Sequence, residues 1–585
     1  MRKQGPYFGA FSRVFVAVLT AAALLGASAA HADPPPPGAD WTEHFISEPD
    51  GTTLHADVLR PKGLSPTAKT PVILSIGPYF NHSGQVGPAG PVEGTSYTPV
   101  GEAGPSSRFY DFVNGAKLMQ RGYTYVMVDL RGFGGSNGCL DWVGPGEQAD
   151  VSAAVKWAAA QSWSSGKVGM YGKSYDGVTG LVGVANRPPG LKAVVAQEPV
   201  YDLYRYLYMN RVRFLNSLAT PALYDLIADT PGILPGDSPQ YQQGALNDFS
   251  RPGCPALNWL DQQDPNHDAA YWQPRNLIPK AKGSTIPLFM TQGFIENNTK
   301  PDGAWDFFNN VAGPKRAWFG MWDHVRGNDT DSNGRLLMGR AGWFDEVMRF
   351  YDSYLKGDKT AAAAMKKDPP LAVETSDGTW RSETRWPPTD STAQTVKLRP
   401  GSYRDDSTNN GTSEGGPPNG EGVWTFSPKL PNDVHLAGVP KATLDLDGPA
   451  GSNLVVDVYD VDAANNATLI SRGTYLLPGS GQVSFDLYGD DWKLPAGHRI
   501  GVLVTGANAE WWQHVPTLQN VTVKSGQITL PFLSCARTRT IQGDPSVKLE
   551  SYKADSPFQV PAADVDAGTD PAFALPPVQQ TCPGR

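Results

Sequence analysis

The sequence predicts an α/β domain that is interrupted by a helical insertion and followed by an all-β domain. As far as residue 200, short apolar runs alternate with helical segments, and this alternation returns between residues 286 and 368. Residues 201–285 show helical patterns only, whereas residues 369–585 show many short strands separated by turn residues. A chain of 585 residues is also too long for one hydrophobic core, so several structural units are expected.

The α/β domain is expected to contain a mostly parallel sheet. In residues 33–200, strands are predicted at 54–59, 72–76, 124–130, 168–171 and 191–197, with a helix at 148–161. In residues 286–368, strands are predicted at 287–291 and 317–321, with helices at 301–311 and 339–355. Strands that alternate with helices build a parallel sheet with both faces covered.

The two remaining regions are expected to form a cap and a β domain. Residues 201–285 contain helix-like segments at 201–218 and 221–228, broken by Pro- and Gly-rich loops, which indicates a helical cap. In residues 369–585, short alternating strands are predicted at 441–446, 453–459, 482–487, 499–505 and 520–530, with a surface loop at 405–420. Many short strands with turn signals are typical of an antiparallel sandwich or jelly roll.

The first 32 residues have the features of a secretory signal peptide. Arg2, Lys3 and Arg13 precede an apolar run at 14–26, and Ala30-His31-Ala32 has the small-x-small pattern of a cleavage site. The run is shorter than the roughly 20 residues that span a bilayer. We therefore expect a secreted mature protein that is free of the membrane, with an uncleaved anchor as the alternative.

The formal net charge of −9 argues against nucleic acid as a partner. An acidic chain without a stripe of clustered Lys and Arg is repelled by the phosphate backbone. Removal of the first 32 residues takes away positive charges only, which strengthens this argument. These features do not predict the oligomeric state.

The four cysteines fit an oxidising compartment. They permit three pairings, and proximity along the chain favours Cys139 with Cys254 and Cys535 with Cys582. None has the spacing of a zinc site or of a redox CxxC pair. Buried free thiols are the alternative.

Ser174 has the surroundings of an activated nucleophile. The segment Gly172-Lys173-Ser174-Tyr175-Asp176-Gly177 directly follows the strand predicted at 168–171. In the nucleophile elbow of an α/β-hydrolase, small residues flank a serine on a sharp strand-to-helix turn, and a nearby base activates the hydroxyl. The generic G-x-S-x-G form has Gly where this chain has Asp176, so the segment alone is incomplete evidence.

Two glycine-rich segments suggest phosphate binding but lack the required register. A Walker A loop ending at Lys173-Ser174 needs Gly at position 167, where the chain has Lys167. The segment at 131–138 also follows a strand, yet it lacks the third glycine of G-x-G-x-x-G. A tight turn beside the elbow is the better interpretation of this segment.

The general base follows from elimination among the histidines. A hydrolase of this fold needs its acid and histidine after the serine, in that order. Only His267 and His324 follow Ser174 before the β domain begins. His324 follows the strand predicted at 317–321, whereas His267 lies in the cap, where a solvated histidine is ordinary. His324 is therefore the predicted base.

The acid partner is expected at the end of the preceding strand, 287–291. Glu296 lies there and is the predicted acid. Asp302 and Asp306 are weaker candidates on the following helix, and Asp323 is expected to shape the histidine loop. This arrangement needs neither a metal nor an organic cofactor.

Three segments together resemble the Xaa-Pro dipeptidyl-peptidase family, which also includes cocaine-esterase-like acyl esterases and α-amino-acid ester hydrolases. They are residues 172–177, 293–301 and 320–324. The family joins an α/β-hydrolase domain with a helical cap to a C-terminal jelly roll, so the resemblance covers almost the whole mature chain. The family usually has Asp where this chain has Glu296.

The resemblance also implies an oxyanion hole. Its two donors would be the Tyr79 hydroxyl and the backbone N–H of Tyr175, which have to converge on the developing charge. For Tyr79, a packed loop tyrosine is the alternative.

The expected function is an exported serine hydrolase that releases N-terminal dipeptides through an acyl-enzyme. Such an exopeptidase must bind a free amino group, and Glu198 is the candidate carboxylate, with an exposed loop acid as the alternative. Tyr201, Tyr204, Tyr206 and Tyr208 are candidates for an apolar proline pocket, although some of them are expected in the core. Trp272 is a further substrate-binding candidate.

Two other functions remain open at this point. One is an acyl esterase or amidase that acts on small acyl esters with the same three catalytic residues. The other is an inert protein that binds carbohydrate or cell wall through its β domain. Retention of serine, acid and histidine in order argues against the inert protein, so the expected partner is a small peptide or acyl-ester substrate.

Overall fold

The computed structural model describes residues 34–82, 86–87, 90–91, 103–229, 233–249, 253–406, 422–507, 511–576 and 578–582. The predicted signal peptide, residues 1–32, and most of the loop predicted at 405–420 lie outside the described residues. In the part of the chain that is described, no helix combines the length and the apolar character needed to cross a membrane.

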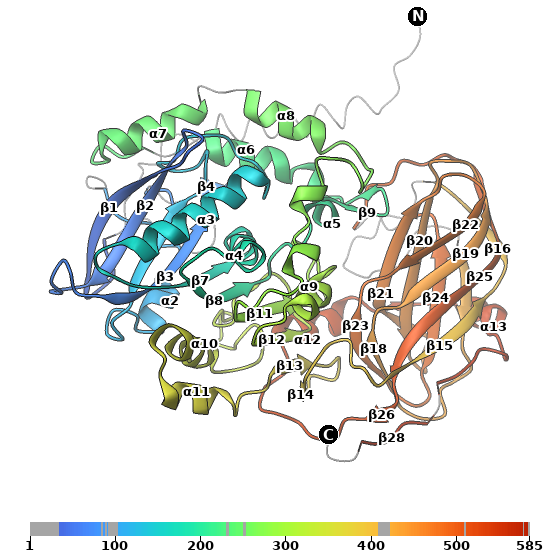
Figure 1. Cartoon of the computed structure of the whole chain (residues 1–585). Coiled ribbons are helices and arrows are strands. Elements are labelled where there is room, and N and C mark those ends of the chain that lie inside the picture. Colours follow the sequence, from blue (N-terminus) through green and yellow to red (C-terminus); the bar gives the residue numbers. More distant parts are fainter. Residues whose placement is uncertain are drawn as a thin grey trace, which may run out of the picture.

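A ten-stranded sheet forms the first domain (Figure 1). Its order is β1 (Ala39–Ser47), β2 (Thr53–Pro61), β6 (Thr124–Asp129), β3 (Thr70–Gly77), β7 (Ser164–Lys173), β8 (Leu191–Gln197), β11 (Leu288–Gly293), β12 (Lys315–Gly320), β13 (Leu371–Glu374) and β14 (Trp380–Glu383). From β6 to β13 all neighbours are parallel, whereas β1 and β2 at one end of the sheet and β14 at the other pair antiparallel. The predicted parallel sheet is confirmed.

Both faces of this sheet are covered by helices. One hydrophobic core contains Val72 and Leu74 of β3 together with α3 (Pro145–Ala160) and α4 (Tyr175–Asn186). The other core contains Ile73, from the opposite face of the same strand, together with α2 (Tyr110–Gly115) and α10 (Trp343–Tyr351). Because side chains alternate across a strand, an uninterrupted apolar run such as that of β3 serves both cores.

The helical cap lies across one end of the sheet (Figure 1). It contains α5 (Leu203–Leu207), α6 (Thr220–Asp229), α7 (Pro239–Phe249) and α8 (Gly253–Asp261). The helix predicted at 201–218 is wrong beyond Leu207, where the chain forms a hairpin of β9 (Tyr208–Met209) and β10 (Val212–Arg213). Asn210 and Arg211 have φ values of 46° and 75°, and two residues with positive φ form a tight hairpin turn that no helix accommodates.

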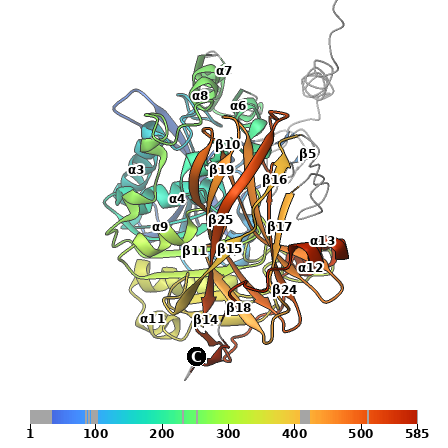
Figure 2. The same ribbon diagram turned by 90° about the vertical axis from the view of Figure 1, so that its right-hand side faces the viewer.

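The C-terminal domain is a sandwich of two antiparallel sheets, which confirms the predicted β fold (Figure 2). One sheet contains β15 (Ser391–Leu398), β16 (Gly401–Arg404), β18 (Val434–Gly438), β19 (Lys441–Asp447), β22 (Gly481–Asp486), β23 (Asp490–Leu494) and β25 (Asn520–Leu533). The other contains β17 (Gly422–Phe426), β20 (Asn453–Val461), β21 (Asn466–Leu476), β24 (Arg499–Thr505) and β27 (Phe558–Gln559).

The boundary predicted between residues 368 and 369 is too early. Leu371 of β13 pairs in parallel with Ala317 of β12, so β13 and β14 extend the first domain's sheet. The β sandwich begins only at Ser391. The composition change near residue 368 marks a connection into the last strands of the α/β sheet.

Two disulfide observations bear on the predicted pairing. Cys535 and Cys582 are bonded to each other, and the bond links β26 (Cys535–Ala536) to the residue directly after its neighbouring strand β28 (Gln580–Thr581). Cys139 is also disulfide-bonded. The side chain of Cys254 lies outside the described residues, so its pairing with Cys139 stays a prediction.

Glu374 connects the two domains beneath the histidine loop. Its carboxylate accepts hydrogen bonds from the backbone N–H groups of Met321 (2.9 Å) and Ser546 (2.7 Å). Ser546 caps α12 (Val547–Asp555), and its hydroxyl donates to the Met321 carbonyl at 2.6 Å. The end of β12 is therefore tied to a helix that follows the β sandwich.

Substitution of Glu374 should destabilise the protein through this connection. Glu374→Ala leaves two buried backbone N–H groups without acceptors, which should lower the free energy of unfolding by about 3 kcal/mol. Urea denaturation measures this change. As a control, Glu550→Gln removes one partner of a half-exposed ion pair with Arg335 and should change stability by less than about 0.5 kcal/mol. Equal effects of the two substitutions would contradict the proposed connection.

Candidate active site

Ser174 lies on a sharp turn between β7 and α4. Its φ of 62° and ψ of −125° belong to neither strand nor helix, and its backbone N–H donates to the Gln197 carbonyl at 2.9 Å. A Cβ atom on Gly172 would lie 2.1 Å from the Asp176 carbonyl oxygen. A Cβ atom on Gly177 would lie 3.0 Å from the Gln197 carbonyl oxygen. The turn therefore requires small residues on both sides of Ser174, as an elbow does.

Asp176, the departure from the generic motif, supports the loop that carries Tyr79. Its buried carboxylate accepts a hydrogen bond from Arg108 Nε at 2.5 Å. A Cβ atom on Gly77 would lie 1.6 Å from Asp176 Oδ1, so the chain two residues before Tyr79 packs directly on this carboxylate. The Arg108 guanidinium in turn lies over the Tyr79 ring, 3.8 Å from its centroid. Asp176 thus positions Tyr79. The glycine that the generic motif has at this position has no side chain to do so.

The Tyr79 hydroxyl faces Ser174. It makes a hydrogen bond with the Tyr224 hydroxyl of cap helix α6, and its interaction with the Ser174 side chain opposes part of the rise in its pKa. Burial, opposed in part by the charge of Arg108, raises the pKa of Tyr79 to about 12, so its hydroxyl keeps the proton that an oxyanion donor needs. A substrate carbonyl that uses this donor must replace Tyr224 as its partner.

Glu296 and His324 lie together at the carboxyl ends of β11 and β12. The distance between Glu296 Oε1 and His324 Nδ1 is 3.6 Å, and Glu296 is fully buried. Its carboxylate also accepts the backbone N–H groups of Asn298 (2.5 Å) and Thr299 (2.9 Å) and the Thr299 hydroxyl. The longer side chain of Glu, compared with Asp, is accommodated because the carboxylate folds back onto its own loop.

These contacts keep Glu296 ionised. Burial favours the neutral acid, but His324, Thr299 and Lys300 together outweigh it and lower the pKa of Glu296 to about 2. Asp323 accepts the backbone N–H of His324 at 2.8 Å, which gives it the loop-shaping contact expected from the sequence. An ionised carboxylate beside Nδ1 favours the tautomer that leaves Nε2 free to act as a base.

A small cavity of about 20 Å³ lies beside Ser174. Its other walls are Trp142, Val143, Tyr175, Val178, Val200, Leu203, Tyr206, Tyr224 and Thr299. This volume holds roughly one water molecule. An acyl group needs more room than this, and among the described wall residues none is a carboxylate.

Glu198 does not line this cavity. It is 0% exposed, and its oxygens accept hydrogen bonds from the Thr291 hydroxyl, Trp322 Nε1 and the Gly293 N–H, each at 2.9 Å. Burial and the nearby charge of Glu296 raise the pKa of Glu198 to about 8. The exposed-acid alternative is wrong, and the predicted contact with a substrate amine is corrected to a structural role beneath the acid and histidine loops.

Tyr201 and Trp272 are also core residues, so their predicted substrate contacts are corrected. They are 1% and 0% exposed. The Tyr201 hydroxyl donates to Gln292 Oε1, and Trp272 Nε1 donates to the Asp264 carbonyl. Of the tyrosines considered with Tyr201, only Tyr206 lines the cavity beside Ser174.

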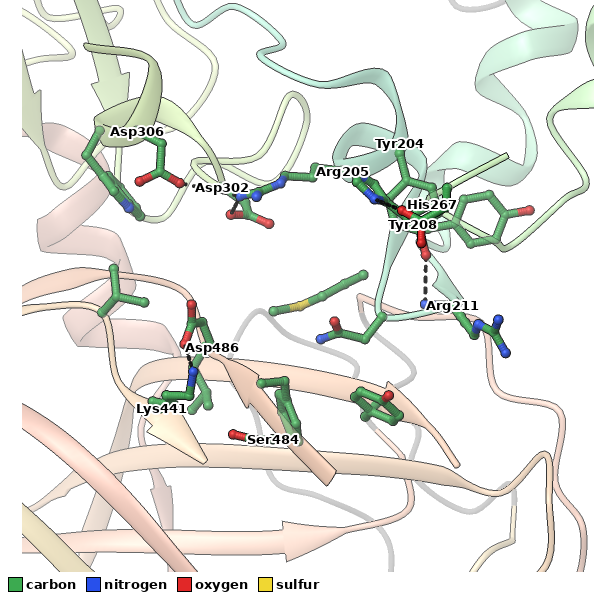
Figure 3. Close-up of a pocket in the computed structure, with 18 of the residues that line it drawn as sticks. Tyr204, Arg205, Tyr208, Arg211, His267, Asp302, Asp306, Lys441, Ser484 and Asp486 are labelled. Atoms are coloured by element: carbon green, nitrogen blue, oxygen red, sulfur yellow. Dashed lines mark hydrogen bonds and ion pairs between the residues drawn. The ribbon is translucent and has the colours of Figure 1, made fainter. Parts of the chain in front are cut away.

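A larger cavity of about 850 Å³ lies between the cap, α9 (Ala304–Asn310) and the β sandwich (Figure 3). Asp302 and Asp306 lie here beside Arg205, at 2.7 Å and 3.7 Å, and do not pair with His324. His267 lines the same cavity, with Nε2 3.4 Å from Asp202. Ser174 is not among its walls, so the alternatives to Glu296 and His324 belong to a different place in the molecule.

The sequence pattern of X-Pro dipeptidyl-peptidase (S15 family) matches residues 50–326. The pattern of the X-Pro dipeptidyl-peptidase C-terminal non-catalytic domain matches residues 363–547. The two patterns name one family and together cover most of the chain. The protein belongs to the Xaa-Pro dipeptidyl-peptidase family. The predicted resemblance is confirmed, and the chain is a serine hydrolase of this family.

Individual relatives are distant. A putative Xaa-Pro dipeptidyl-peptidase of Streptomyces avermitilis is 25% identical over 435 residues, which cover 70% of this chain but only 58% of that relative. A cocaine esterase of a Rhodococcus species is 26% identical and covers 58% of each chain. The structure of a CocE/NonD family hydrolase from Staphylococcus aureus superposes with a TM-score of 0.64 at 16% identity, covering 84% of this chain and 94% of that one.

Arg108 and Tyr224 complete this family member's site but were not predicted from the sequence. Arg108 lies 68 residues before its partner Asp176, and Tyr224 lies 145 residues after Tyr79. No local pattern marks either residue. The one available signal was Asp176 itself, since a buried carboxylate at an elbow calls for a cation.

Loss of Arg108 should impair catalysis through Tyr79. Tyr79→Phe removes the predicted oxyanion donor and should lower kcat about 100-fold or more. Arg108→Met alone should lower kcat by nearly as much as Tyr79→Phe. In the Tyr79→Phe background, Arg108→Met should lower kcat little further, because both changes remove the same interaction. Arg121→Met, at a half-exposed position, is the control and should leave kcat unchanged. Independent, multiplying effects of the two substitutions would contradict a positioning role.

The buried Glu198 should make stability depend on pH. The pKa of Glu198 rises from 4.5 to about 8 on folding, so the unfolded chain releases this proton at a lower pH than the folded protein does. Its contribution to the free energy of unfolding therefore falls as pH rises from 4.5 to about 8, at up to about 1.4 kcal/mol per pH unit. Glu198→Gln should lack this decline, so its stability relative to wild type should increase between pH 5 and pH 8 in urea denaturation. A constant difference would refute the raised pKa.

Proposed function

We propose that Ser174 of this serine hydrolase attacks an acyl carbon while His324 accepts the hydroxyl proton. The observation that carries the proposal is the 3.6 Å contact between His324 and the buried, ionised Glu296, on strands that end beside the Ser174 elbow. Glu296 orients the imidazole and stabilises the imidazolium. The Tyr79 hydroxyl and the Tyr175 N–H stabilise the oxyanion.

The acyl-enzyme then forms and breaks in two balanced steps. The leaving alcohol or amine takes the proton from His324 as its bond to the acyl carbon breaks, which leaves an ester on Ser174. Water then attacks this ester, gives a proton to His324, and releases the carboxylic acid as the Ser174 hydroxyl recovers its proton. No step requires a metal or an organic cofactor.

For the acyl group, the geometry favours a small, uncharged and apolar substituent. The described walls beside Ser174 are mostly aromatic and aliphatic, and Glu198 is held beneath the site by three donors. A small acyl ester or amide fits these walls. A dipeptide with a free amino group is the second candidate, favoured by the similarity of the chain to a protein of Streptomyces avermitilis named putative Xaa-Pro dipeptidyl-peptidase.

We also propose that the protein is exported. The basic residues, apolar run and Ala30-His31-Ala32 site at the N-terminus support export. A mature N-terminus at residue 33, found by mass spectrometry of protein from the culture medium, would agree with this proposal. An intact N-terminus on protein retained by the cells would contradict it.

One substrate panel tests the proposed chemistry. The mature protein is offered a nitrophenyl ester of a short acyl chain, a chromogenic Ala-Pro amide, and the N-acetylated form of that amide. We expect ester turnover, whereas cleavage of only the free-amine peptide would favour the exopeptidase. Ser174→Ala should lower kcat about a million-fold for every substrate, and near-normal activity in this variant would end the proposal. A folded wild-type protein that turns over none of the three would favour a binding role.

A further inference from the structure

A second cluster of polar side chains is buried where the cap meets the first strands of the sheet. Its inner members are Glu43 on β1, His55 and Asp57 on β2, and His82 beyond the end of β3. The side chains of both histidines and of Asp57 are 0% exposed, and that of Glu43 is 19% exposed. The proposed hydrolytic mechanism uses none of these residues.

The inner atoms have the spacing of ligands around one ion. His55 Nε2 lies 3.5 Å from Glu43 Oε1 and 3.7 Å from Asp57 Oδ1, and His82 Nε2 lies 3.3 Å from Asp57 Oδ2. Ligand atoms of Glu43, His55 and His82 all lie within 4.8 Å of one another. In a tetrahedral zinc site with bonds of about 2.0–2.1 Å, neighbouring ligand atoms are roughly 3.3 Å apart.

Both imidazole rings are oriented by carboxylates on their outer side. Asp129 lies 2.8 Å from His55 Nδ1, and Asp237 lies 2.8 Å from His82 Nδ1. Each carboxylate is itself held by a backbone N–H group, that of Gly135 for Asp129 and that of Leu234 for Asp237. A carboxylate that accepts from Nδ1 turns the Nε2 lone pair inward, which is the arrangement found behind histidine ligands of zinc.

The inward atoms lack other partners. His55 Nε2, His82 Nε2 and Asp57 Oδ2 are buried and make no hydrogen bond of good geometry within the described residues. Buried polar atoms in this condition destabilise a fold. Asp57 Oδ1 is also oriented, because it accepts from Trp41 Nε1 at 2.6 Å. Three unsatisfied atoms that converge from strand β2 and the loop after β3 indicate a bound cation.

We propose that Glu43, His55, Asp57 and His82 bind one divalent transition-metal ion of the zinc class. Two imidazoles with two carboxylates suit zinc, whereas calcium and magnesium prefer oxygen ligands alone. The ion stabilises the contact between sheet and cap, because Asp237 and Tyr241 belong to the cap. The Tyr241 ring stacks on His82 at 4.1 Å, and its hydroxyl accepts the His82 backbone N–H. This role is separate from the hydrolysis at Ser174.

Metal retention tests the proposal directly. The full-length mature protein is stripped with EDTA, dialysed against zinc chloride, passed through a desalting column and analysed for zinc by mass spectrometry. We expect about one zinc per wild-type chain and a higher thermal midpoint than in the stripped protein. Cobalt chloride in place of zinc should give the visible absorption of a tetrahedral Co²⁺ site.

Three substitutions locate the ion. Glu43→Gln, at the partly exposed ligand, and His82→Gln should both abolish zinc retention and the thermal shift. Asp237→Asn, behind His82, should weaken zinc binding 10- to 100-fold. His498→Gln is the matched control, since His498 forms a similar pair with Asp460 (2.7 Å) in the β sandwich, and it should retain zinc like wild type.

Two results would overturn the proposal. One is wild-type protein that is folded by circular dichroism but keeps no zinc after desalting. The other is zinc retention that Glu43→Gln and His82→Gln leave unchanged while both variants stay folded. Because the readout is bound metal and not turnover, either result leaves the proposed function at Ser174 untouched.

Discussion

The backbone of Ser174 lies in a conformation that costs a non-glycine residue about 1–3 kcal/mol, and much of the first domain serves to hold it there. Parallel pairing of β7 with β3 and β8 fixes one side of the turn, and the Gln197 carbonyl holds the Ser174 N–H. On the other side α4 starts at once, with Gly172 and Gly177 providing the clearance. The strain is offset by this packing and places the half-buried hydroxyl at the carboxyl edge of the sheet.

The same edge collects the remaining reactive groups, because parallel strands end on the same side. Glu296 and His324 follow neighbouring strands, and Tyr79 follows the strand beside β7. The site is crowded: Glu296 is held ionised inside the protein, Glu198 below it is held neutral at ordinary pH, and the Tyr224 hydroxyl contacts that of Tyr79. Two carboxyl groups close to each other thus keep different charges because their partners differ.

The features that could be predicted from the sequence are those that depend on a pattern of contiguous residues. The elbow at Ser174, the strand ends before Glu296 and His324, and the apolar runs of the parallel strands all have local patterns. Arg108 and Tyr224 have none, because their partners are distant in the chain. The same reason explains the error at residue 368: β13 is recognisable as part of the first sheet only through its pairing with β12. Asn210 and Arg211 show the converse, since two positive φ values ended a helix that the apolar pattern favoured.

The contact of Ser546 with Met321 and Glu374 has a consequence for the order in which the active site is assembled. The loop that carries His324 is anchored by a residue 225 positions further along the chain. During synthesis the ribosome must therefore deliver nearly the whole polypeptide before this loop has its final support. A nascent or truncated chain with an intact elbow still lacks a firmly placed His324, so the proposed mechanism expects hydrolysis only after the C-terminal region has emerged and docked.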